Sequence, residues 1–197
     1  MLKHIGGADM KKIILSCVFL ICTTVSLFSE GTKTKGVYTN INIGTGAVFE
    51  DDAYFNPFNI QLESILTYNR WMGMKVSTGL FFPYNVSLNG DSSNFRNLFD
   101  NFWGFNVLFG AAFTPVKTSK HFLAISAGIH AQVYFYKINS SKYKNITFGA
   151  GITFDYNYSF TEKFFLNLGL DVYTDFIAGK SVAGKGGTFY IGVGLKE

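Results

Sequence analysis

Apolar residues occupy every second position in eight segments of the chain, and this alternation is the clearest pattern in the sequence. In one segment, Leu166, Leu168 and Leu170 alternate with Asn167 and Asp171. A β-strand points successive side chains to opposite faces, so each segment has one apolar face and one polar face. The sequence therefore predicts eight strands, which cover residues 37–49, 58–68, 72–84, 103–113, 123–135, 146–160, 164–176 and 189–195.

The two faces differ in composition. The apolar set holds no Asp, Glu, Lys, Arg or His, and its rings gather near strand ends, as Trp103 and Phe113 do. The opposite set is rich in Gly, Asn, Ser and Thr, whereas water-facing strands of soluble proteins usually carry Lys and Glu. Small residues suit the interior of an eight-stranded barrel, which side chains fill. An outward apolar belt between two aromatic girdles is typical of membrane-spanning barrels.

A soluble, ligand-binding barrel of the lipocalin kind is an alternative, because its strands alternate in the same way with the apolar face inward. The chain is 18% aromatic and 15% charged, which is rich in rings and poor in charge for a soluble surface. The position of Leu166, Leu168 and Leu170, outside the wall or at its centre, decides between the two architectures.

The N-terminus has the layout of a secretory signal peptide. Lys11 and Lys12 form a positive region, an apolar run follows, and a small residue precedes Glu30. We expect translation to start at Met10 and residues 1–29 to be removed. A retained anchor helix is one alternative, and a lipoprotein modified at Cys17 or Cys22 is another.

The mature chain, residues 30–197, has the length of one domain. Both cysteines lie in the predicted leader, so the mature chain has no disulfide framework, no thiolate nucleophile and no cysteine metal site. Removal of the leader leaves 14 basic and 12 acidic residues, a net charge of +2. The basic character of the full chain is therefore partly a property of the leader and does not indicate a nucleic-acid partner.

The predicted connections between strands alternate in length. The turns near 69–71 and 161–163 are short, and the segment 115–121 is intermediate. The long connections are 50–57, 85–102, 137–145 and 177–187. Outer-membrane barrels have short periplasmic turns and longer outer loops, and an even strand count places both termini in the periplasm.

The mature chain resembles the small eight-stranded outer-membrane barrels, including the OmpX and OmpW types and the barrel of OmpA. The resemblance implies an all-β, eight-stranded, antiparallel, up-and-down transmembrane β-barrel preceded by a signal-peptide helix. It also implies outer-membrane lipid, the barrel-insertion machinery and periplasmic chaperones as partners. The last strand keeps the alternation, but the chain ends in Lys196 and Glu197 instead of an aromatic residue. This departure favours a divergent diderm, such as a spirochaete, over a close enterobacterial relative.

The polar set of alternating positions includes ionisable and amide side chains, which we expect to point into the barrel. One hypothesis is a polar conduit, with a histidine that titrates near neutral pH. The other is a paired network that fills a narrow interior, because buried charges require partners. The predicted lumen residues are Glu63, Lys75, His130, Gln132, Asp155, Asn157, Asn167 and Asp171.

Enzymes exist on this fold, but their residues are missing here. Deacylases of the PagL kind use a His-x-Ser pair that faces lipid, whereas Gln132 stands two residues after His130 and the histidine faces inward. Acyltransferases of the PagP kind need a loop histidine near an Asp-Ser pair, and Asp91-Ser92 has none nearby. We predict a protein without catalytic residues, metal ligands or cofactors.

The outer loops are the remaining candidates for contact with an extracellular ligand or a host component. Lysines there could meet anionic head groups or an acidic polymer, and apolar loop tips can bind a partner. The candidates are Phe95, Leu98, Phe99, Lys142, Lys144, Lys180 and Lys185. The sequence predicts a structural or surface-interaction role through these loops, with a narrow OmpW-like channel for small or hydrophobic molecules as the alternative.

Overall fold

The computed structural model describes residues 36–50, 53–88, 91–93, 101–138, 140–178 and 184–197. The predicted leader lies outside these residues. No helix among them is long and apolar enough to cross a membrane. The strands are β1 (Gly36–Glu50), β2 (Ala53–Thr67), β3 (Met72–Leu88), β4 (Asp91–Ser93), β5 (Asn101–Lys117), β6 (His121–Ile138), β7 (Ser141–Ser159), β8 (Phe164–Ala178) and β9 (Lys185–Lys196).

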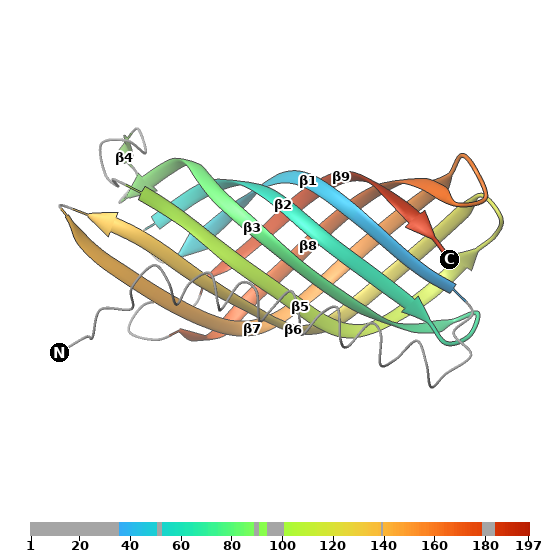
Figure 1. Cartoon of the computed structure of the whole chain (residues 1–197). Helices are drawn as coiled ribbons and strands as arrows, with labels where there is room; N and C mark the ends of the chain where they lie inside the picture. The colour runs from blue at the N-terminus through green and yellow to red at the C-terminus, as the bar shows by residue number, and fades with distance from the viewer. Residues whose placement is uncertain (1–35, 51–52, 89–90, 94–100, 139, 179–183) are drawn as a thin grey trace. The chain divides into compact units, whose positions relative to one another are not determined.

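Eight long antiparallel strands close into a barrel, which confirms the predicted strand count (Figure 1). Each long strand pairs with its neighbour in sequence, apart from the short β4, and β1 closes the sheet by pairing with both β2 and β9. In this closure Ile41 stands opposite Leu62 on one side and Val193 on the other. Closure satisfies the backbone groups that an open sheet edge would leave unpaired.

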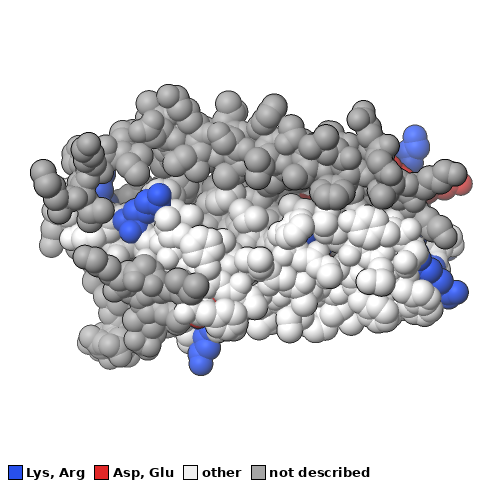
Figure 2. Space-filling model, turned by 90° about the horizontal axis from the view of Figure 1, so that it is seen from below, with Lys and Arg blue, Asp and Glu red and all other residues white. Residues whose placement is uncertain are grey.

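The apolar side chains face outward, as the parity predicts for a membrane barrel. On β8, Leu168 and Leu170 are exposed, whereas Asn167 is fully buried and Asp171 is 7% exposed. Ile129 on β6 is 66% exposed, although it is a large aliphatic side chain. Figure 2 shows a broad uncharged wall with charged side chains toward its ends. The arrangement is the reverse of a soluble lipocalin-like barrel, whose apolar face points inward.

Two of the four predicted long loops are wrong, because the strands extend further than the alternation does. Glu50 pairs with Ala53, and Ile138 pairs with Ser141, so β1–β2 and β6–β7 are tight hairpins. Near this end the inward face also carries large apolar side chains, such as the buried Phe55 of β2, so the apolar–polar alternation ends while the backbone ladder continues. The predicted loop 85–102 likewise contains the end of β3, the short β4 and the start of β5.

Prolines mark two β-bulges that change the parity of their strands. Pro57 pairs with Pro83, and the register then shifts so that Tyr84 is an extra residue on β3. Pro115 lies in a second bulge, through which β5 continues to Lys117 instead of entering the predicted connection. A bulge disrupts the ladder locally, so a proline beside the extra residue costs fewer hydrogen bonds than a proline in a regular stretch of strand.

The two ends of the barrel differ. The turn end comprises the turns at 68–71, 118–120 and 160–163 together with the start of β1 and the end of β9. A polar side chain caps each turn, as when Asn69 Oδ1 accepts hydrogen bonds from the backbone N–H groups of Trp71 and Met72. The loop end comprises the β1–β2 and β6–β7 hairpins, β4 and the connection from β8 to β9.

Candidate functional site: the filled interior of the barrel

The interior has three layers, with a polar centre between two apolar clusters. Rings dominate both clusters, and the sequence analysis missed the clusters because it described the inward face by its abundant Gly, Asn, Ser and Thr residues. The loop-end cluster consists of Val48, Phe55, Phe81, Val86, Phe102, Tyr134 and Tyr173. The turn-end cluster consists of Tyr38, Ile65, Ala112, Phe122, Ala124 and Phe165.

Inward glycines make room for these rings. Gly104 stands opposite Phe81, and Gly194 stands opposite Phe165. A Cβ atom at either glycine would collide with the ring of its partner. The inward rings could therefore have been recognised from an aromatic residue in the polar set of one strand that stands opposite a glycine in the polar set of the next strand.

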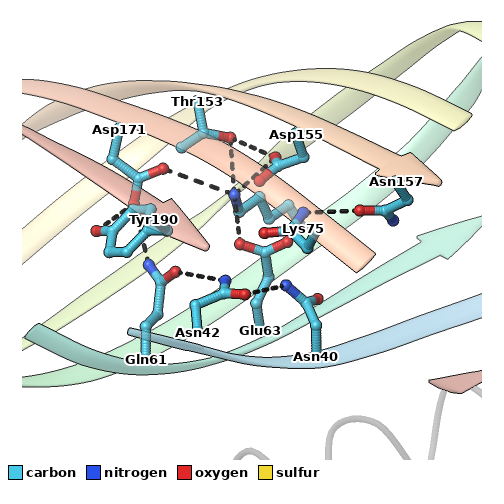
Figure 3. A network of polar contacts seen from close by, with 11 residues as sticks. Asn40, Asn42, Gln61, Glu63, Lys75, Thr153, Asp155, Asn157, Asp171 and Tyr190 are labelled. Atoms are coloured by element: carbon cyan, nitrogen blue, oxygen red, sulfur yellow. Dashed lines mark hydrogen bonds and ion pairs between the residues drawn. The ribbon is translucent and has the colours of Figure 1, made fainter. Parts of the chain in front are cut away.

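Lys75 is the centre of the polar layer (Figure 3). Its Nζ atom lies 2.7 Å from Glu63 Oε2 and 2.8 Å from Asp155 Oδ2. It also donates a hydrogen bond of 2.9 Å to Thr153 Oγ1, and Asp171 Oδ1 lies 3.8 Å away. The lysine comes from β3, and these partners come from β2, β7 and β8, so the cluster ties together opposite sides of the wall.

Asp171 connects the lysine to a chain of amides. Its Oδ2 atom accepts hydrogen bonds from Gln61 Nε2 at 3.0 Å and from the Tyr190 hydroxyl at 2.9 Å. Gln61 in turn accepts from Asn42, and Asn42 accepts from Asn40 (Figure 3). Sequence reasoning named Asp171 but not these partners, although all of them have the inward parity.

The other predicted lumen residues are buried in separate contacts. Asn167 Nδ2 donates to Asn157 Oδ1 over 2.7 Å. His130 Nδ1 lies 3.4 Å from Asp175 Oδ1, and Gln132 Nε2 donates to Asp175 Oδ2 over 3.5 Å. The structure thus divides the eight predicted residues into a lysine cluster, an amide pair and a histidine group on the loop-end side.

The lysine cluster has more acidic than basic groups. One ammonium faces the carboxylates of Glu63, Asp155 and Asp171, and all four side chains are at least nine-tenths buried. In a low-dielectric interior these charges stabilise one another only as a complete set. Among the described residues no group of three or more His, Cys, Asp or Glu side chains has the arrangement of a metal site.

The interior leaves little free space beside this network. A small cavity lies next to Asp171, with Gln61, His130 and Tyr190 in its wall, and its volume of about 10 Å³ is enough for one water molecule at most. Since rings fill the lumen on both sides of the polar layer, the described side chains pack the interior instead of lining a bore.

The predicted loop lysines occupy strands. Lys142 and Lys144 belong to β7, and Lys185 is the first residue of β9, so the prediction that these three lie in loops is wrong. The strands extend beyond the apolar belt, so they include these lysines. Phe95, Leu98, Phe99 and Lys180 lie outside the described residues.

No protein-family model and no curated protein matches the chain. Solved structures do match it. Neisserial surface protein A superposes with a TM-score of 0.64 at 12% identity, over 81% of this chain and 96% of that one. The outer membrane protein OprG of Pseudomonas aeruginosa gives 0.57 at 12% identity, over 84% and 98% of the two chains. The attachment invasion locus protein Ail of Yersinia pestis gives 0.56 at 15% identity, over 82% and 98%.

These similarities identify the fold. The chain is an eight-stranded antiparallel β-barrel of the kind found in small outer-membrane proteins, as its alternation and the resemblance of its architecture predicted.

Proposed function

We propose that the chain is an integral outer-membrane protein that acts at the cell surface through its loop end and has no catalytic activity. The observation that supports this most directly is the combination of an outward apolar belt with an interior filled by rings and paired charges. The first feature suits a lipid environment, and the second favours a structural or contact role over transport.

The turn end faces the periplasm in this proposal, together with both ends of the mature chain. Its connections are short, whereas two longer connections, at 89–100 and 179–184, belong to the loop end. Short periplasmic turns and longer outer loops are typical of outer-membrane barrels.

Single cysteines test this orientation, because residues 30–197 contain none. Ser140 at the loop end and Ser119 at the turn end are both exposed. A membrane-impermeant maleimide added to intact cells is expected to label Ser140→Cys but not Ser119→Cys, and permeabilising the outer membrane should make both react. A parent with Cys17 and Cys22 replaced provides the background. Labelling of Ser119→Cys alone in intact cells would show that the turn end, and not the loop end, faces the outside. If neither cysteine reacted after permeabilisation, the proposed outer-membrane location would be contradicted.

The filled interior predicts electrical silence. Purified protein, shown to be folded by heat-modifiable gel mobility, should give no resolvable single-channel conductance in a planar lipid bilayer, because the two ring clusters and the Lys75 network occupy the lumen. Steady conductance that changes on Asp171→Asn would instead support the narrow channel.

The names of two proteins with similar structures support a contact role at the loop end. Two of the similar structures are called an attachment invasion locus protein and a surface protein, and Ail has also been solved with the heparin analogue sucrose octasulfate. We propose that the loop end of this chain likewise meets an extracellular ligand or host component, with Phe95, Leu98, Phe99, Lys180 and Lys185 as candidate contacts.

A further inference from the structure

The small cavity inside the barrel lies between two of its polar groups. Asp171 of the lysine cluster and His130 of the histidine group are both in its wall. Gln61, Ser77 and Tyr190 are also wall residues, so the cavity is surrounded by polar side chains from both sides of the lumen. Its volume of about 10 Å³ limits any occupant to the size of a water molecule or a small ion.

The strand register shows how the cavity forms. Ser77 on β3 stands opposite Leu108 on β5, and Leu108 stands opposite His130 on β6, so the three residues make one inward row. Asp171 comes from β8 and faces this row together with Tyr190 of β9. Ser77 has the shortest side chain of the row, and it therefore leaves space in front of Asp171.

One carboxylate oxygen of Asp171 needs a donor on this side. Its Oδ2 atom accepts hydrogen bonds from Gln61 and Tyr190, whereas its Oδ1 atom is buried and has no hydrogen-bond partner among the residues that the structure describes. Lys75 Nζ lies 3.8 Å from Oδ1, which is too far for a hydrogen bond. A buried acceptor without a donor is strongly destabilising, so such atoms are normally satisfied by the protein or by an ordered water.

Two more buried side chains offer polar atoms around the same volume. Ser77 is 2% exposed and His130 is 4% exposed. His130 contacts Asp175 through Nδ1, which leaves Nε2 for a second partner. A hydroxyl donates and accepts, and an imidazole nitrogen does either according to its tautomer. With Asp171 Oδ1 these atoms make three hydrogen-bonding sites, and a buried water typically makes about three hydrogen bonds.

The charges in and near the wall favour water over an ion. An anion would meet the carboxylate of Asp171. A cation would meet the ammonium of Lys75, which already faces the same Oδ1 atom at 3.8 Å. In the described part of the chain, no three His, Cys, Asp or Glu side chains are arranged as a metal site. Water carries no net charge, and it can donate to the carboxylate while it accepts from another group.

We propose that the cavity binds a single internal water molecule, which donates a hydrogen bond to Asp171 Oδ1 and also bonds to the Ser77 hydroxyl and to His130 Nε2. This water joins the histidine group to the lysine cluster. Hydrogen bonds then run from Asp175, on the loop-end side, through Asp171 and the amide chain to Asn40 of β1. The site goes beyond the proposed function, because it depends on neither the membrane nor an extracellular partner.

Crystal structures at a resolution that shows ordered surface waters test the site. In the unaltered protein we expect one electron-density peak in the cavity, about 2.5–3.2 Å from Asp171 Oδ1, Ser77 Oγ and His130 Nε2. The peak should be lost in Ser77→Val, because this change removes one hydrogen-bond partner and places methyl groups beside the cavity.

Ser87→Val provides the matched control. It makes the same change on β3 at a half-buried serine outside the cavity wall, so the peak should remain. Heat-modifiable mobility of both variants shows whether each barrel is folded. If Ser77→Val does not fold, the density in the unaltered protein still decides whether the cavity is occupied.

Three results would overturn the proposal. A cavity without density in the unaltered protein would be dry. A peak of unchanged height in Ser77→Val would show that the serine does not hold the occupant. Crystals grown with rubidium in place of sodium identify the occupant, since an anomalous signal at the peak would assign it to a cation, and a peak without that signal agrees with water.

Discussion

Replacing Lys75 with methionine is expected to destabilise the folded barrel by about 3–5 kcal/mol, the usual cost of removing one member of a buried ion cluster. The substitution keeps most of the side-chain volume and removes the ammonium that lies within 3 Å of both Glu63 and Asp155. Three carboxylates would then remain in the interior without a positive charge. Urea unfolding in lipid vesicles, followed by tryptophan fluorescence, measures the loss.

Two companion variants separate charge from packing. Lys163→Met, at an exposed position of the turn end, should change the unfolding free energy by less than about 0.5 kcal/mol. Adding Glu63→Gln, Asp155→Asn and Asp171→Asn to Lys75→Met removes every charge of the cluster and should recover most of the stability, because a neutral set leaves no uncompensated ion. A Lys75→Met barrel as stable as its parent would show that the lysine cluster contributes nothing to the fold.

Replacing Leu170 with arginine should lower the free energy of unfolding by about 2–4 kcal/mol, because a lipid-facing cation is most destabilising near the bilayer midplane. Leu170 is 40% exposed and lies near the middle of β8, among other outward apolar side chains. The loss is measured by the same urea titration in vesicles.

Leu195 provides the depth control for this substitution. It is 50% exposed on the same outward face, and it pairs with Phe164 at the turn end. Leu195→Arg should cost about 0–1 kcal/mol, since charges near the interface are tolerated. Equal costs at the two positions, or a larger cost at Leu195, would contradict the placement of the belt.

The strand count and the side that each strand turns outward could be predicted from sequence because both follow from a period of two. The proximity of Glu63 to Lys75 could also be anticipated, since their strands are neighbours in sequence. The contact between Gln61 and Asp171 could not, because it joins β2 to β8 across the lumen. Which side chains meet across the lumen depends on the stagger of the strands in the closed barrel. A local apolar–polar pattern carries no information on this stagger.

The sequence also did not predict where the strands end or which side chains fill the lumen. Sequence patterning stopped at Phe49 and resumed at Phe58, although the ladder runs on to Glu50 and restarts at Ala53. It also described the inward face by its small and polar residues, whereas inward rings from several strands meet at each end of the lumen. Alternation reports what surrounds a strand, so it shows neither how far the strand's hydrogen bonds extend nor which inward side chains meet across the lumen.

The most direct test of the account uses the unaltered protein. With Ile, Leu and Val methyl groups labelled in otherwise deuterated protein, nuclear Overhauser effects to the acyl chains of detergent report which methyl groups touch the surrounding hydrocarbon. Outward-facing Leu168, Leu170, Val172 and Ile191 should show them, and the buried Val48, Ile65, Val86 and Leu108 should not. Acyl-chain contacts at the second set, with water contacts at the first, would contradict an outward apolar belt around a filled interior.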